Sequence, residues 1–304
     1  MPTLAIRPSR QELILIGVTV IWGATFLIVH TAMRHVGPMF FVGARFLTAG
    51  VLGLVLFRRQ MRGFTRQELV GGLWIGVTVF LGYVLQTTGL KSISASKSAF
   101  ISALYVPITP ILQWLGLRRP PGLMAWLGIG FAFAGLILLA GPEAFRLGLG
   151  LGEIVTLLSA IAFAGQIVLI GAFAGPTDPR RVTVIQVLVG SALAFAAMPF
   201  AGERPPAFSW VWVACALGLG TTSILIQLAM NWAQRTISPA RATVIYAAEP
   251  VWGGLFGRLA GDRQPALALL GAALIVAGVI VSELKPKSLA GQNEKVPATD
   301  GERC

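Results

Sequence analysis

Charged side chains are scarce in this sequence of 304 residues. Lys, Arg, Asp and Glu together make up 12% of the chain, whereas they make up about a quarter of an average soluble domain. Hydrophobic residues account for 55%, and the mean hydropathy is +0.77. This composition excludes an ordinary soluble domain and predicts an integral membrane protein.

Residues that build catalytic and metal centres are also rare. The two cysteines, Cys215 in an apolar run and Cys304 at the end, predict no disulfide framework and no metal cluster. Two histidines, His30 and His35, and one mid-span carboxylate are fewer than the cluster that a membrane enzyme usually needs. The Walker A pattern of ATP hydrolysis is missing too. We therefore expect no enzyme activity, no cofactor and no metal.

Acidic residues are few, and the formal net charge is +12. The cations fall in short clusters between apolar stretches, which is typical of membrane flanks and not of a nucleic-acid interface. We expect a lipid bilayer as the surrounding partner, and no nucleic acid. The sequence leaves the oligomeric state open, a monomer included.

Long apolar runs are abundant, and a bilayer is spanned by about 20 such residues in a helix. Because lipid cannot satisfy an open sheet edge, all spans should be helices. Ten windows qualify: 13–33, 39–57, 70–90, 97–117, 122–141, 152–172, 182–200, 209–231, 240–260 and 265–284.

Ten spans would put both termini on one side of the membrane, and the cations indicate which side. Sixteen Lys and Arg residues fall on the side of the termini and seven on the other. The excess of cations predicts that both termini are cytoplasmic. The polar segment 285–304 should be a disordered cytoplasmic tail.

Internal similarity relates the two halves of the chain. The stretch "LGIGFAFAGLI" at 127–137 matches "LGAALIVAGVI" at 270–280, and "LKSISASKSAFI" at 90–101 matches "QRTISPARATVI" at 234–245. A weaker match sets Arg45 opposite Gln186. We expect two five-helix repeats, at 11–141 and 150–284. Because five is odd, the second would be inverted, an architecture typical of secondary transporters with a binding site near the midplane.

Glu249 and Pro250 stand side by side within the ninth span. A carboxylate at this depth should face other helices or a cavity, because exposure to lipid is costly. Two interpretations stay open: a hydrogen-bond acceptor, or an ion-pair partner of Arg241, that fixes helix packing; or a site for a substrate ammonium or a proton. Pro250 would release the carbonyl of Tyr246 from helical hydrogen bonding.

Other charges and prolines within the spans allow similar alternatives. Arg45 is expected to be a helix-positioning cation near the outer boundary, the alternative being a clamp for a carboxylate or phosphate. Lys97 and its repeat counterpart Arg241 favour a role as interface anchors. Pro107 and Pro110 in the fourth span, like Pro250, predict kinks that are either static or used in gating. Gly128, Gly135, Gly271 and Gly278 indicate close helix contacts.

An aromatic and amide-rich set of residues could line a substrate cavity. Some of them are three or four positions apart, which places them on one helix face. Such a set suits an amphipathic organic solute, although each aromatic alone could simply be packing. The set comprises Trp22, Phe26, Tyr83, Gln86, Tyr105, Gln166, Gln227, Asn231, Tyr246 and Glu249.

Several motifs together resemble the drug/metabolite transporter superfamily, EamA type. They are "WGATF" at 22–26, "ARFLTAG" at 44–50, "AAEPV" at 247–251 and "LGAALIVAGVI" at 270–280. The likeness covers about residues 11–284 and implies a ten-span carrier of small metabolites in the bacterial inner membrane. Within the superfamily the chain looks most like exporters of amino acids, including YddG-like exporters of aromatic amino acids.

The expected function is export of small metabolites, such as aromatic or other apolar amino acids, by alternating access. Drugs, amines or nucleoside-type metabolites are the alternative substrates. A channel is the rival from another class, although neither repeated filter loops nor rings of charge are present. A membrane-embedded enzyme is a remoter rival.

Overall fold

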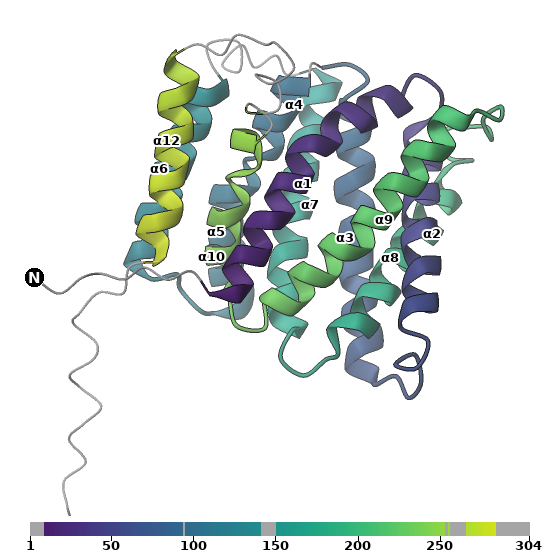
Figure 1. Ribbon diagram of the computed structural model, residues 1–304, viewed down its shortest axis with the longest axis horizontal. Helices are drawn as coiled ribbons and strands as arrows, with labels where there is room; N and C mark the ends of the chain where they lie inside the picture. The colour runs from purple at the N-terminus through teal and green to yellow at the C-terminus, as the bar shows by residue number, and fades with distance from the viewer. Residues whose placement is uncertain (1–8, 94, 141–149, 253–254, 256–265, 284–304) are drawn as a thin grey trace, which may run out of the picture.

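The computed structural model describes residues 9–93, 95–140, 150–252, 255 and 266–283, and the regular elements there are all helices. Figure 1 shows the long helices side by side in one bundle. The predicted tail at 285–304 lies outside the described residues. The helices are α1 (Arg10–Ala32), α2 (Pro38–Leu56), α3 (Arg66–Gly89), α4 (Ala95–Ser102), α5 (Tyr105–Leu117), α6 (Leu123–Ala140), α7 (Leu151–Phe173), α8 (Pro179–Ala197), α9 (Trp210–Ala233), α10 (Pro239–Tyr246) and α12 (Ala266–Glu283).

Six helical stretches in the described part are long and apolar enough to cross a membrane. They are α2, α3, α7, α8, α9 and the stretch 97–117, which includes most of α4 and all of α5. Two shorter apolar stretches lie within α6 and α12. Large apolar side chains such as Val55, Leu115 and Leu151 are exposed on the surface, as expected where lipid replaces water. The chain is therefore an all-helical membrane protein.

Polar residues mark where several helices begin. Ser9 and Thr65 each form a capping box, with Glu12 and Glu68 respectively, at the start of α1 and α3. Asp178 caps α8 by accepting a hydrogen bond from the backbone of Arg180. These caps satisfy backbone donors at helix ends that lie where the apolar runs stop.

Helices of equal length recur at a nearly constant spacing along the chain. Both α1 and α7 have 23 residues, both α2 and α8 have 19, and both α3 and α9 have 24. The short helices α4 and α10 have 8 residues each, and α6 and α12 have 18 each. Apart from α5, which has 13 residues, the described helices thus divide into two sets with the same order of lengths.

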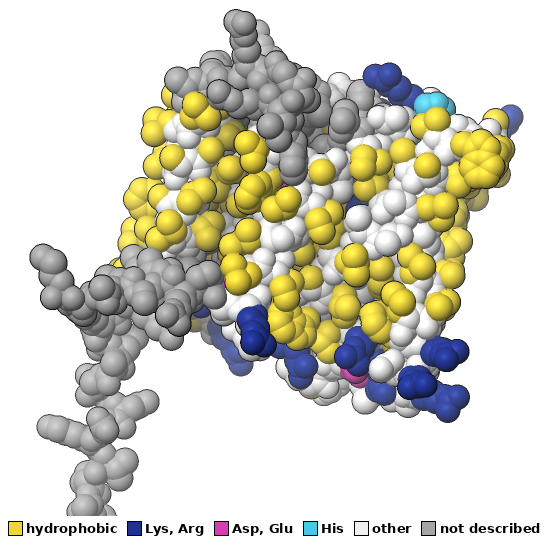
Figure 2. Space-filling view, viewed as in Figure 1, with side chains coloured by type: hydrophobic (Ala, Val, Ile, Leu, Met, Phe, Trp, Pro, Cys, Tyr) yellow, Lys and Arg dark blue, Asp and Glu magenta, His cyan; other side chains and the backbone are white. Residues whose placement is uncertain are grey.

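Basic side chains gather at one end of the bundle, here called the arginine-rich end. Figure 2 shows Lys and Arg along its lower edge, with hydrophobic side chains covering the band above. Helix α1 begins at this end and α12 finishes there (Figure 1). Its basic residues include Arg58, Arg59, Arg62, Arg118, Arg119, Arg180, Arg181 and Arg235. We call the other end the opposite end.

Helices α6 and α12 pack together through glycines, as the sequence predicts, and form a pair at one edge of the bundle (Figure 1). A Cβ added to Gly135 would lie 2.5 Å from the carbonyl oxygen of Gly271, and one added to Gly278 would lie 2.6 Å from that of Gly128. These contacts leave no room for a side chain, so the backbones touch.

We expect Gly135→Leu to destabilise the protein by about 1–3 kcal/mol, because the new side chain would push α6 and α12 apart. The matched control is Gly130→Leu on the same helix, since a Cβ there meets nothing within 4 Å. Thermal unfolding in detergent measures both. Equal melting temperatures for the two variants would contradict the close packing.

Candidate functional site

The helix that crosses at 97–117 is interrupted between α4 and α5, at Ala103 and Leu104. Pro107 has no N–H to donate to the carbonyl of Ala103, its helical partner. Val106 donates to that carbonyl instead, at 2.9 Å, and Leu104 donates to Ile101 at 3.1 Å. The expected kink is therefore a short tightened segment that precedes Pro107, while Pro110 lies buried inside α5.

A second interruption follows α10, at Ala247 and Ala248, before helical residues resume at Glu249. Pro250 cannot donate to the carbonyl of Tyr246. Ala248 donates to Ile245 at 3.1 Å, and Val251 donates to Ala248 at 3.1 Å. The two interruptions fall 144 residues apart, so both sets of helices are broken at the same point.

Glu249 is the first helical residue after its interruption, just as Tyr105 is after the other. Its side chain is half-buried and lies near enough to Tyr83 and Tyr105 to interact electrostatically with both. No described cation lies within ion-pair distance of this carboxylate. Arg241, one partner considered from the sequence, pairs with Glu12.

Aromatic rings surround this carboxylate. Trp22 packs edge-to-face against Tyr246, with ring centroids 5.3 Å apart. Tyr83 packs in the same way against Phe46 and Phe163. Tyr83, Tyr105 and Tyr246 are all buried. Five of the residues expected from the sequence therefore meet around the interruptions: Trp22, Tyr83, Tyr105, Tyr246 and Glu249.

Arg45 is not the boundary cation that we expected. Its side chain is buried, with 4% of its surface exposed, and its Nε donates to the Ser223 hydroxyl at 2.7 Å. The guanidinium carbon lies 4.8 Å from the centre of the Tyr83 ring, a favourable cation–π geometry. Arg45 thus fixes Tyr83 from the side of α2 and α9, and its side chain points between helices instead of reaching toward the membrane surface.

A buried amide network extends from this cluster toward the arginine-rich end. The Oε1 of Gln227 accepts hydrogen bonds from Gln166 at 2.9 Å and from Gln186 at 2.8 Å. Asn231 donates to Gln186 and to the Thr183 hydroxyl. The predicted residues Gln166, Gln227 and Asn231 therefore act together and join α7, α8 and α9.

Two predicted residues lie apart from these groups. Gln86 is half-buried and donates to the Ser102 hydroxyl at 3.0 Å, which connects α3 to the end of α4. The side chain of Phe26 is outside the described residues, although its backbone belongs to α1.

Some polar atoms at the centre have no hydrogen-bond partner in the described part of the chain. They include Nε2 of Gln227, which lies near Tyr83, and the hydroxyl of Tyr246, which lies near Gln234, and both side chains are fully buried. Because an unsatisfied buried polar group is costly, we expect these atoms to bond to those neighbours or to water.

Sequence reasoning missed Gln186 and Ser223 as parts of the site. One signal was available for Gln186, since the repeat sets it opposite Arg45. The hydroxyl of Ser223 carries no such signal, because serine is common in membrane helices as a packing residue.

Within the described ranges, no three His, Cys, Asp or Glu residues group as metal ligands would. The arrangement instead offers one carboxylate, three phenol groups and an amide network. These groups can bind an organic solute through charge, hydrogen bonds and ring contacts.

Proteins with similar sequences carry the names of transporters. An uncharacterized transporter of Archaeoglobus fulgidus is 27% identical over 272 residues, which cover 88% of this chain and 84% of that protein. The uncharacterized inner membrane transporter YedA of Escherichia coli is 27% identical, over 87% of this chain and 88% of YedA. An S-adenosylmethionine/S-adenosylhomocysteine transporter of Chlamydia muridarum is 30% identical, but over only 38% of this chain and 37% of that protein.

A solved crystal structure has the same fold, with a TM-score of 0.76 and 18% sequence identity over 91% of this chain and 99% of that one. The EamA-like transporter family matches this chain twice, at residues 10–141 and 150–284. The chain therefore belongs to the EamA-like transporter family.

Proposed function

We propose that this protein is a secondary transporter that exports amino acids with aromatic or other apolar side chains across the inner membrane by alternating access. One observation supports the location of the substrate site. Glu249 is a half-buried carboxylate within the predicted span 240–260, beside a helix interruption and without a described cation partner. Intramembrane carboxylates usually mark a substrate or ion path.

The proposed architecture is ten spans in two inverted five-helix repeats, at 11–141 and 150–284. Support comes from the equal helix lengths in the two sets and from the double family match. The first set begins at the arginine-rich end and the second at the opposite end, which favours inversion. The excess of cations at the arginine-rich end favours a cytoplasmic location for both termini.

The substrate chemistry follows from the groups around the interruptions. An ammonium group would pair with Glu249 and with the carbonyl ends of α4 and α10, where the helix dipole is negative. A carboxylate would lie at the positive starts of the helical segments that follow, as half-helices do in other carriers. The rings of Trp22, Tyr105 and Tyr246 would contact an apolar or aromatic side chain.

A second candidate is a metabolite that joins an amino acid to a nucleoside, within the wider class of drugs, amines and nucleosides. The Chlamydia muridarum relative, an S-adenosylmethionine/S-adenosylhomocysteine transporter, favours it. Such a molecule also carries an ammonium group and an aromatic base, so the same residues would serve. A small-molecule substrate is common to both candidates.

Uptake into inside-out membrane vesicles tests the substrate class. We expect labelled phenylalanine or leucine to accumulate, and unlabelled aromatic amino acids to compete at lower concentrations than glycine or serine. The contacts of the three rings are the physical reason. Vesicles without the protein are the control. If only small polar amino acids competed, the rings would be packing and the aromatic assignment would be wrong.

A further inference from the structure

Two ion pairs join the two sets of helices, one at each end of the bundle. At the opposite end, Lys97 of α4 pairs with Glu153 of α7, at 2.5 Å. At the arginine-rich end, Arg241 of α10 pairs with Glu12 of α1, also at 2.5 Å. In each pair the cation and the carboxylate come from different sets.

The two ion pairs are equivalent in the repeat. Lys97 and Arg241 are each the third residue of a short helix that ends at an interruption. Glu12 and Glu153 are each the third residue of a 23-residue helix. The same ion pair therefore occurs twice. In one pair the first set of helices supplies the cation and the second set the carboxylate, and in the other pair these roles are reversed.

We propose that these ion pairs are the two gates of the carrier and that they separate in alternation. Separation of Arg241 from Glu12 opens the arginine-rich end, and separation of Lys97 from Glu153 opens the opposite end. This inference rests on the proposed alternating access and names the residues that control it.

The position of both pairs suits a contact that opens and closes. The short helices α4 and α10 end at interruptions, so each can tilt without moving the helical segment beyond. Three of the four side chains are partly accessible, between 15% and 31%, and Glu12 is the buried one, at 7%, so water can reach each pair when the charges separate. Partly exposed ion pairs are weak, which permits separation during each cycle.

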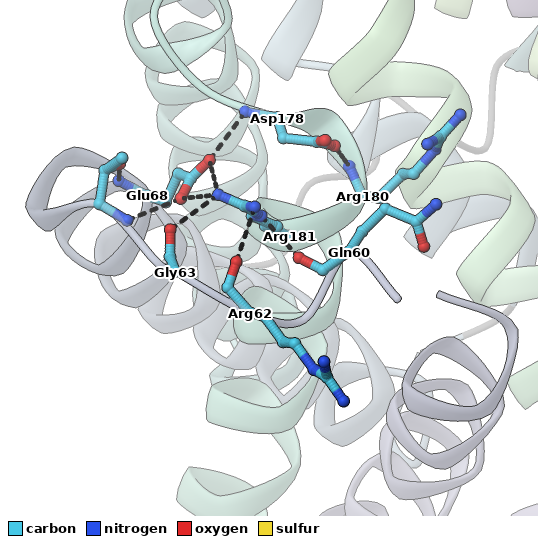
Figure 3. A network of polar contacts seen from close by, with 8 residues as sticks. Gln60, Arg62, Gly63, Glu68, Asp178, Arg180 and Arg181 are labelled. Atoms are coloured by element: carbon cyan, nitrogen blue, oxygen red, sulfur yellow. Dashed lines mark hydrogen bonds and ion pairs between the residues drawn. The ribbon is translucent and has the colours of Figure 1, made fainter. Parts of the chain in front are cut away.

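The third ion pair of the described structure, also at the arginine-rich end, is surrounded by additional hydrogen bonds (Figure 3). Arg181 of α8 contacts Glu68 of α3 at 3.2 Å, and it also donates to the carbonyls of Gln60, Arg62 and Gly63. Glu68 also accepts from the backbone of Asp178. This group of one ion pair and several hydrogen bonds braces the loop between α2 and α3. We expect it to stay intact throughout the transport cycle.

A brace at the opposite end matches it. There the Glu203 carboxylate accepts hydrogen bonds from the backbone N–H groups of Met39 and Phe40 at 3.1 Å, and Phe40 packs on Trp212. The two braces hold α3 to α8 at the arginine-rich end and α2 to the loop between α8 and α9 at the opposite end. Helices α4 and α10 also make hydrogen bonds within their own sets, Ser102 with Gln86 and the Ala240 backbone with Gln113, but both helices end at an interruption and both carry an ion pair to the other set. The interruptions and the ion pairs together assign gating to α4 and α10.

Accessibility of a single cysteine tests the gates. Cys215 and Cys304 are replaced by serine, and Ser102→Cys places the reporter at the end of α4, where it is 5% exposed. A membrane-impermeant maleimide then labels it from either face, in right-side-out and inside-out vesicles. The same reporter protein is combined with Lys97→Gln, Glu12→Gln or, as the matched control, Glu68→Gln.

We expect Lys97→Gln to raise the labelling rate from the opposite end by about two- to fivefold, the range for loss of a partly exposed ion pair, and to lower it from the arginine-rich end. Glu12→Gln should do the reverse, and Glu68→Gln should change neither rate. Glu153→Gln and Arg241→Gln provide a second variant of each pair. The exchange Lys97→Glu with Glu153→Lys should restore the original rates.

Unchanged labelling rates in folded variants of both pairs would contradict the proposed gating. An equal change of the labelling rate in Glu68→Gln would contradict it too. Thermal unfolding identifies variants that fail to fold. Labelling requires neither substrate nor transport. If the gating proposal is wrong, the labelling rates stay unchanged while the protein still transports. If the proposed function is wrong, the wild-type protein does not transport the proposed amino acids.

Discussion

Glu249→Gln protein is expected to bind its substrate at least tenfold more weakly while folding normally. The amide keeps the shape of the side chain and one acceptor, but it removes the charge that would pair with an ammonium group. Hydrogen bonds to charged groups contribute about 1.5–3 kcal/mol, which corresponds to a tenfold to hundredfold change in affinity. Stability should change little, because no described cation depends on this carboxylate.

The measurement is transport by purified protein in liposomes, with and without a pH gradient, normalised to the amount of reconstituted protein. We expect passive transport to persist at saturating substrate, because no second membrane-depth carboxylate is found among the described residues to relay a proton. Glu68→Gln is the control, since it removes a carboxylate far from the interruptions. Wild-type affinity and wild-type pH dependence in Glu249→Gln would together remove Glu249 from the mechanism.

Replacing the prolines at the interruptions should raise stability and slow transport. A proline in the first turn of a helix prevents that helix from continuing into the preceding segment, and Pro250→Ala would restore an N–H able to reach the Tyr246 carbonyl. Pro107→Ala would do the same for the carbonyl of Ala103. A straighter helix would hold α4 or α10 in one orientation, so we expect turnover to fall at least tenfold.

Melting temperature and initial transport rate, measured on the same preparations, separate a moving hinge from a static kink. Pro110→Ala is the matched control, because this proline lies inside α5 and beyond the interruption. The hinge predicts a higher melting temperature with slower transport for Pro107→Ala and Pro250→Ala alone. Normal transport by both variants would show that the interruptions only permit packing.

Much of the fold can be predicted from hydropathy alone. The windows at 13–33 and 209–231, for example, overlap almost entirely with α1 and α9, because the thickness of the bilayer sets the length of a helix. The repeat also indicated that Arg45 and Gln186 are related, and both prove to be buried at the centre. Patterns along the chain therefore located the helices and part of the site.

Contacts between distant segments could not be predicted in the same way. Lys97 was expected to be an interface anchor, and no pattern along the chain paired it with Glu153, 56 residues away. The interruptions begin before Pro107 and Pro250, because the lost hydrogen bond lies one turn earlier than the proline. The burial of Arg45 between helices could not be predicted, because it depends on how α2 packs against α3 and α9.

Counterflow in liposomes tests the central claim, alternating access to one site, most directly. Liposomes loaded with an unlabelled aromatic amino acid are diluted into a trace of the same labelled compound, with empty liposomes as the control. A carrier exchanges one molecule for another, so the label should accumulate transiently inside above its outside concentration. A substrate-dependent ohmic current without accumulation of label would indicate a channel and contradict the account.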